Sequence, residues 1–125
     1  MSNWTIKVYI AESGINYFQK WLDSLPKTAQ ADIDERIRLL AATGYWHRPY
    51  AAKLKVYDEI WEIRIRSGNV QYRPLGCFAP SNKVFSLLGG AIERGSRFEP
   101  KDAPKIAEHR KTLIFKGKGK LDEYC

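Results

Sequence analysis

Hydrophobic and polar residues alternate at the start of the chain, in the segment WTIKVYI. The apolar positions fall on every second residue, which is the period of a half-buried β-strand, and they are Trp4, Ile6, Val8 and Ile10. The spacing then changes to three and four residues, which is the period of an amphipathic helix, at Ile15, Phe18, Leu22 and Leu25. We expect Ser13 to cap this helix and Pro26 to end it.

A second helix is predicted directly after the first. Ile33, Ile37 and Leu40 recur on one helical face, whereas charged residues occupy most of the other. Thr28 is placed to cap this helix, and Gly44 is placed to stop it. Because only a short turn separates the two helices, we expect them to pack as a hairpin.

Four strands are predicted after a loop from Tyr45 to Ala52. Their sequences are KLKVY (53–57), IWEIRI (60–65), VQYRPLGCF (70–78) and KVFSLLGG (83–90). Hairpin-sized turn signals separate them, at Asp58-Glu59, Ser67-Gly68-Asn69 and Ala79-Pro80-Ser81-Asn82. The pattern predicts an antiparallel meander.

The last regular element expected is a helix that Asp102 caps. The predicted order is therefore β-α-α-β-β-β-β-α, and such segregation of helices from strands favours an α+β fold, with a helical hairpin packed on a mainly antiparallel twisted sheet. We expect residues 1–115 to form one domain. Residues 116–125, KGKGKLDEYC, are polar and glycine-rich, and we expect them to be a mobile tail that does not pack.

Composition narrows the class of protein. The 125 residues are 44% hydrophobic, which is enough for a single core. No apolar run is long enough to cross a membrane, and the N-terminus lacks the pattern of a signal peptide, so we expect a cytoplasmic protein. The two cysteines, Cys77 and Cys125, indicate no disulfide framework and are expected to be free thiols.

The net charge of +7 is concentrated in one late segment. Between Arg94 and Lys120 there are nine Lys/Arg and three Asp/Glu, a net of +6. A basic protein of this size commonly binds a polyanion such as nucleic acid. The alternative is a solvated basic face that serves only solubility.

The segment IWEIRIR places arginines inside a predicted strand. Alternation gives it an apolar face and a charged, wet face, with Trp61, Ile63 and Ile65 on the first and Glu62, Arg64 and Arg66 on the second. We expect Glu62 and Arg64 to neutralise each other rather than to catalyse a reaction. Pro74, in the next strand, cannot donate to the sheet ladder, so it is expected at an edge or beside a bulge. Periodicity leaves the side of the neighbouring Arg73 undecided.

The tryptophans divide into two groups. Trp4, Trp21 and Trp61 lie on apolar faces and are expected in the core. Trp46 lies in a loop beside basic and aromatic neighbours, Tyr45, His47 and Arg48, and such a cluster is a candidate binding edge if it is exposed.

The order of motifs from the fourth predicted element onward resembles a known family. The stretch KLKVYDEIWEIRIRSGNVQYRPLGCF, then KVFSLLGGAIERGSRFEP, then a helix beginning near DAPKIAEHRK is similar to the RelE/HigB toxin superfamily, and more closely to its phage-derived HigB-like branch. The resemblance covers roughly Trp4 to Lys111 and is most specific from Lys53 to Pro100.

This resemblance implies a compact RNase-like α+β fold and the toxin of a type II toxin–antitoxin pair. Such toxins are ribosome-associated endoribonucleases that cleave mRNA by attack of the ribose 2′-hydroxyl on the adjacent phosphate, without a metal or another cofactor. The implied partners are the ribosome, mRNA and a cognate antitoxin with a helix-turn-helix. The same fold also hosts gyrase inhibitors and phage relatives of undefined activity, so a protein that binds without nuclease activity is the alternative.

The resemblance also assigns candidate site residues by position. Arg73 matches an arginine that commonly faces the scissile phosphate, and Arg94 and Arg97 fall in a segment that supplies further phosphate contacts or the acid. For RNA binding, Lys53 and Lys55 match the paired lysines of the family by position, and Arg64 and Phe98 are further candidates. Phe98 is either a platform for a base or part of the core.

The chemistry of cleavage needs a base for the 2′-oxygen, cationic donors for the phosphorane and an acid for the leaving 5′-oxygen. The chain contains only two histidines, His47 and His109, and no spacing brings them together. Glu93 interrupts the basic run in which relatives carry lysines. The sequence therefore leaves the general acid and base unidentified.

Overall fold

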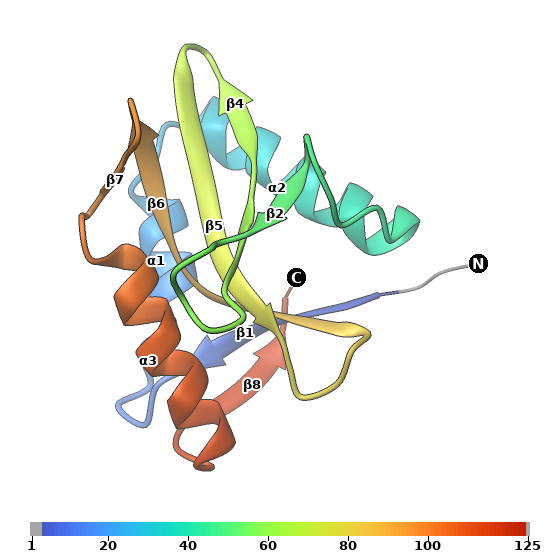
Figure 1. Cartoon of the computed structure of the whole chain (residues 1–125), viewed down its shortest axis with the longest axis vertical. Helices are drawn as coiled ribbons and strands as arrows, with labels where there is room; N and C mark the ends of the chain where they lie inside the picture. Colours follow the sequence, from blue (N-terminus) through green and yellow to red (C-terminus); the bar gives the residue numbers. More distant parts are fainter. Residues whose placement is uncertain (1–3, 125) are drawn as a thin grey trace.

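The computed structural model describes residues 4–124. In this part of the chain three helices and eight strands follow one another, which confirms the α+β prediction (Figure 1). In chain order they are β1 (Thr5–Ile10), α1 (Tyr17–Asp23), α2 (Lys27–Thr43), β2 (Ala51–Lys53), β3 (Trp61–Ile63), β4 (Ile65–Ser67), β5 (Val70–Phe78), β6 (Val84–Arg94), β7 (Arg97–Glu99), α3 (Ala103–Phe115) and β8 (Lys120–Glu123).

All the strands belong to one sheet. Its order is β2-β3-β5-β6-β1-β8, with β4 also paired to β5 and β7 also paired to β6. The pairing of β1 with β6 is parallel, whereas the other strand pairs are antiparallel. The predicted meander is therefore correct from β2 to β6, and β1 joins it on the far side of β6.

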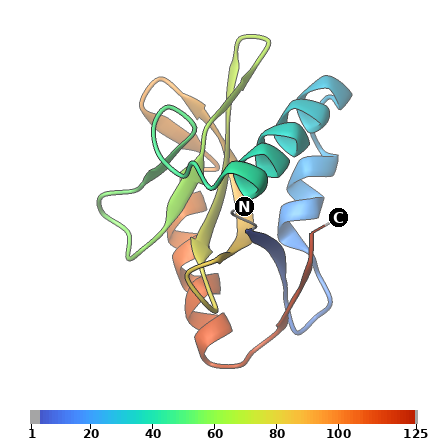
Figure 2. The same ribbon diagram turned by 90° about the vertical axis from the view of Figure 1, so that its right-hand side faces the viewer.

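Helices cover both faces of this sheet. Figure 2 shows α1 and α2 on one side and α3 on the other. One core cluster joins the hairpin residues Phe18, Ile33 and Ile37 to the sheet, and a second cluster joins Ala103 and Ala107 of α3 to the opposite face. The prediction of one wet face is therefore wrong around Glu62, which is buried because α3 and its flanking loops lie on that side.

The helix termini follow local side-chain chemistry. Asn16, rather than the predicted Ser13, caps α1, because its side-chain oxygen accepts a hydrogen bond from the backbone nitrogen of Gln19 at 3.0 Å. Thr28 lies inside the first turn of α2, so it is not the cap that the pattern predicted. Gly44 ends α2 in the left-handed conformation, as predicted, with φ of 70°.

Two predicted strands have different limits in the structure. Only Lys53 of the predicted strand KLKVY is in a strand, because residues 54–60 form a loop that α3 holds. Glu108 accepts the backbone N–H of Asp58 at 2.7 Å, and Lys111 donates to the Asp58 carboxylate at 2.9 Å. β6 continues past Gly90 and turns into a hairpin with β7, which periodicity did not indicate.

Pro74 lies in the central strand β5. A bulge follows it, between Leu75 and Gly76, so its predicted position beside a bulge is confirmed. The ladder on the other side of β5 is interrupted at the same level, since β3 ends at Ile63 and β4 begins at Ile65. A proline without an N–H is tolerated at this gap.

The prediction that residues 116–125 do not pack is wrong for residues 120–124. Residues 120–123 form β8, which pairs antiparallel with β1 at the sheet edge. Tyr124 then packs beside the ring of Phe18, and its hydroxyl donates a hydrogen bond to Asp34. The segment is polar in composition, yet its backbone completes the sheet.

Trp46 is buried, so the exposed aromatic cluster that the sequence allowed does not include it. Its ring stacks on Phe85 with centroids 4.6 Å apart and also contacts Trp4 and Phe78. The thiol of Cys77 is free and buried, as expected, and Cys125 lies outside the described residues. No helix within residues 4–124 combines the length and apolar character needed to span a bilayer.

Candidate functional site

Arg73 lies in the middle of β5, on the side of the sheet that carries α3. Its register partner on β6 is Ala91, and its side chain is only 3% exposed. The sequence could not decide on which face Arg73 lies. The structure places it on the same face as Glu62, because the β3–β5 and β4–β5 registers set positions 62, 64 and 66 across from positions 75, 73 and 71.

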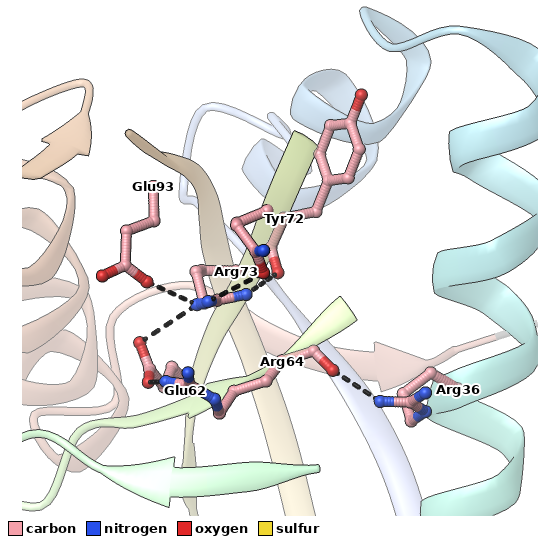
Figure 3. A network of polar contacts seen from close by, with 7 residues as sticks. Arg36, Glu62, Arg64, Tyr72, Arg73 and Glu93 are labelled. Atoms are coloured by element: carbon pink, nitrogen blue, oxygen red, sulfur yellow. Dashed lines mark hydrogen bonds and ion pairs between the residues drawn. The ribbon is translucent and has the colours of Figure 1, made fainter. Parts of the chain in front are cut away.

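Each nitrogen of the Arg73 guanidinium has a protein acceptor (Figure 3). Its Nε donates to Glu93 Oε1 at 2.8 Å, Nη1 to the Tyr72 carbonyl at 3.0 Å, and Nη2 to the Gln71 side-chain oxygen at 3.2 Å. Glu62 Oε1 lies 3.6 Å from the same Nε. A buried arginine held in this way is rigid and compensated by two carboxylates.

Arg64 stands opposite Arg73, and Glu62 bridges the two cations. Glu62 Oε2 accepts a bond from Arg64 Nη1 at 2.5 Å, so the predicted neutralisation of Arg64 by Glu62 is confirmed. On α2, Arg36 donates to the Arg64 carbonyl at 2.5 Å, which anchors the backbone between β3 and β4 (Figure 3). We call Arg64, Glu62, Arg73 and Glu93 the arginine–glutamate network; its two positive and two negative charges balance.

The members of the network differ in their access to solvent. The side chains of Arg73 and Glu62 are 3% and 5% exposed, whereas those of Arg64 and Glu93 are 28% and 25% exposed. Burial lowers the pKa of Arg73, and the like charge of Arg64 adds to this, while both glutamates oppose it. An arginine keeps its charge under such shifts, so the network depends on its carboxylates being ionised.

Arg94 and Arg97 are not brought to the network. They are register partners at the tip of the β6–β7 hairpin, where strand alternation directs them to the face opposite Glu93. Both are exposed, and Arg94 bonds Glu99 at 2.9 Å. The structure therefore separates the three arginines that the resemblance assigned to catalysis, whose roles stay predictions.

The residues implied for RNA binding are also divided. Lys53 pairs with Trp61 in register, which places it on the other face from Arg64, and it forms an ion pair with Glu59 at 3.3 Å. Lys55 is exposed in the loop after β2. Phe98 is half-buried against the α3-side core cluster. Of the residues implied for RNA binding, only Arg64 belongs to the network.

Sequence reasoning missed Glu93 and Gln71 as partners of Arg73. Gln71 lies two residues before Arg73 on the same strand, so alternation alone could have suggested it, whereas the contact of Glu93 depends on the β5–β6 register across 20 residues of sequence. His47, in a loop, and His109, on α3, are exposed, and within residues 4–124 neither is a hydrogen-bond or ion-pair partner of the network residues. Within residues 4–124 no three His, Cys, Asp or Glu side chains come together as metal ligands would.

A comparison with protein families finds one match. The model described as "Phage derived protein Gp49-like (DUF891)" matches residues 20–111, a stretch that runs from α1 into α3 and includes the whole network. That family is related to the toxins of toxin–antitoxin systems. Neither the curated proteins nor the solved structures contain a match to the chain.

Proposed function

Because the chain belongs to the Gp49-like family of phage-derived proteins, we propose that it is the toxin of a toxin–antitoxin pair and that it cleaves ribosome-bound mRNA. In this proposal a helix-turn-helix antitoxin holds the toxin inactive until the antitoxin is removed. Family membership supports the toxin class, and the RNA target rests on the basic charge of the chain and on the network.

The observation that carries the RNA proposal is the partial exposure of Arg64 in a rigid setting. Glu62 engages Nη1 of Arg64, and no other protein acceptor of its guanidinium is found within residues 4–124. The remaining donors of a 28% exposed side chain are free to grip phosphate oxygens bidentately. Arg66 follows on the same strand face and adds a second, exposed cation.

Glu93 is the carboxylate best placed to act as the base. It is the more exposed of the two glutamates, and it pairs with Arg73, which Glu62 links to Arg64. In the proposed step, Glu93 takes the proton of the 2′-hydroxyl, the 2′-oxygen forms a bond to phosphorus, and the bond from phosphorus to the 5′-oxygen breaks. The leaving 5′-oxygen takes a proton from water.

A second candidate function is binding without cleavage, for example inhibition of gyrase. The observation that favours it is the charge balance of the network, in which every nitrogen of the Arg73 guanidinium already has a protein acceptor. A site of this kind presents fewer free donors to a phosphorane than a nuclease commonly does.

Induction in a bacterial host separates the two candidates. We would express the wild type, Arg64→Ala and, as a matched control, Lys105→Ala, an exposed cation on α3. The proposal expects growth arrest with new RNA 5′ ends inside translated messages for the wild type and Lys105→Ala, and neither effect for Arg64→Ala. Arrest with intact messages would select the binding candidate, and normal growth on induction of the wild type would refute the toxin proposal.

A further inference from the structure

The free edge of β6 has a gap between its two strand partners. β1 pairs with residues 84–87 and β7 with residues 92–94, so within the described chain no strand covers this edge from Leu88 to Ala91. Helices α1 and α3, which lie on opposite faces of the sheet, approach each other at this gap (Figure 1). Arg110 of α3 bridges it, with Nη1 donating to the Leu88 carbonyl at 2.8 Å.

Arg110 is a half-buried cation without a counter-ion. Its guanidinium lies 3.7 Å from the ring centroid of Tyr17 on α1, and no carboxylate within residues 4–124 pairs with it. Burial lowers its pKa, and the groups that oppose this are the phenols of Tyr17 and Tyr9. Arg73 is buried more deeply but has two carboxylates, whereas Arg110 has none within the described chain, so the two arginines differ in how their charge is compensated.

A cavity of about 320 Å³ lies beside Arg110, between α1, β6 and α3. This volume falls within the range of roughly 300–1,000 Å³ that is usual for small-molecule sites. Arg110 and Lys20 both line the cavity, whereas none of its lining residues is acidic. The rest of the wall is largely apolar, including Trp21, Ile106 and Pro100.

The two glycines of β6 make room for this arrangement. A Cβ on Gly89 would lie 2.9 Å from Arg110 Nη1, and a Cβ on Gly90 would collide with the ring of Trp21. Side chains at these positions would therefore displace the cation and the apolar wall that line the cavity.

We propose that this cavity binds a nucleotide, with its phosphate on Arg110 and Lys20 and its sugar and base against Trp21 and Ile106. A guanidinium fork and an ammonium, with no acid among the lining residues, match the two negative charges of a phosphate monoester. The ligand supplies the counter-charge that Arg110 lacks in the protein. The site does not depend on the nuclease proposal, because none of the network residues lines the cavity.

Two sources can supply this chemistry, a free nucleotide or one nucleotide of an RNA strand. We would titrate the ¹⁵N-labelled protein with uridine monophosphate, hexauridylate and inorganic phosphate, and follow the amide signals of Gly89 and Gly90. The proposal expects saturable shifts at these two amides with uridine monophosphate. If hexauridylate binds more tightly than uridine monophosphate at the same amides, an RNA strand is the natural ligand. If it binds equally or more weakly, the free nucleotide is the natural ligand.

Variants test which side chains hold the phosphate. Arg110→Gln is expected to weaken the binding of uridine monophosphate about tenfold or more, since a charge-assisted contact is lost. Lys20→Gln, at an exposed helix position, gives the same test if Arg110→Gln does not fold. Lys105→Gln is the matched control, because Lys105 is exposed and does not line the cavity. Unchanged affinity in Lys20→Gln and in a folded Arg110→Gln, no shift at Gly89 and Gly90, or equally tight binding of inorganic phosphate would each overturn the proposal.

Discussion

Replacement of Arg73 by methionine tests whether the arginine–glutamate network is a structural element of the sheet. Methionine keeps much of the apolar stem but removes three hydrogen bonds, to Glu93, Tyr72 and Gln71. Hydrogen bonds of charged groups contribute about 1.5–3 kcal/mol each, and desolvation of the guanidinium offsets several kcal/mol of their sum. We therefore expect Arg73→Met to lower the free energy of unfolding by about 3–5 kcal/mol, which is the usual cost of removing one partner of a buried ion pair.

The bridging glutamate makes the effect non-additive. Glu62 contacts both arginines, so Glu62→Gln is destabilising alone but less so in the Arg73→Met background, where one of its partners is already lost. A double-mutant cycle is expected to give a coupling energy of about 1–3 kcal/mol.

Urea denaturation followed by circular dichroism measures these differences, provided that the slope of the unfolding free energy with urea is unchanged among the variants. Lys105→Met is the control, because it also replaces a cation by methionine but at an exposed position. A loss below about 1 kcal/mol for Arg73→Met would refute the reasoning, since surface substitutions fall in that range. Arg73 would then be held too weakly to organise Glu62 and Arg64.

Three further predictions concern sites away from the network. Gly90→Ala is expected to destabilise the fold by about 1–3 kcal/mol, because its Cβ meets the ring of Trp21; a neutral result in urea denaturation would contradict the packing at the β6 gap. Cys77 is expected to resist Ellman's reagent at pH 8 in the native Cys125→Ser variant, where it is the one cysteine left, since burial raises the pKa of its thiol to about 12; reaction at the rate of a free thiol would contradict this. Tyr124→Phe is expected to cost about 1–3 kcal/mol at pH 7 through loss of the bond to Asp34. Burial and Asp34 raise the pKa of the Tyr124 phenol, so its contribution is full below about pH 10 and is lost as pH rises further; a difference between wild type and variant that grows above pH 10 would contradict the sign.

The parts of the fold that the sequence predicted correctly depend on local periodicity. The stop of α2 at Gly44 needed only residues within a few positions of it. The prediction of a strand at KLKVY was wrong because Asp58, in the loop that follows, forms hydrogen bonds with α3, about 50 residues away. No local pattern reports such a contact. The sequence did not predict β8 for a related reason. A polar segment forms a strand when a neighbouring sheet edge supplies hydrogen-bond partners, as β1 does here.

The residues of the network were predictable only in part, and its geometry was not. The resemblance drew attention to Arg73 and Arg64, and both belong to the network. Their compensation by Glu62 and Glu93 depends on strand register, which a one-residue shift would reverse. Alternation also separates Arg94 from Glu93, its neighbour in sequence, so adjacent residues in a basic run belong to different faces of the sheet.

Arg73 matches a phosphate-facing arginine by position, yet two carboxylates already compensate it in the structure. The two observations are compatible if one carboxylate is exchangeable. Glu62 is 5% exposed and bonds two arginines, so it cannot leave without stranding a buried charge. Glu93 is 25% exposed and can turn toward water, where its charge is solvated. A phosphate that replaces Glu93 on Arg73 substitutes one anion for another and leaves the guanidinium compensated throughout. The same exchange frees the Glu93 carboxylate beside the bound phosphate, which is where the proposed cleavage needs its base.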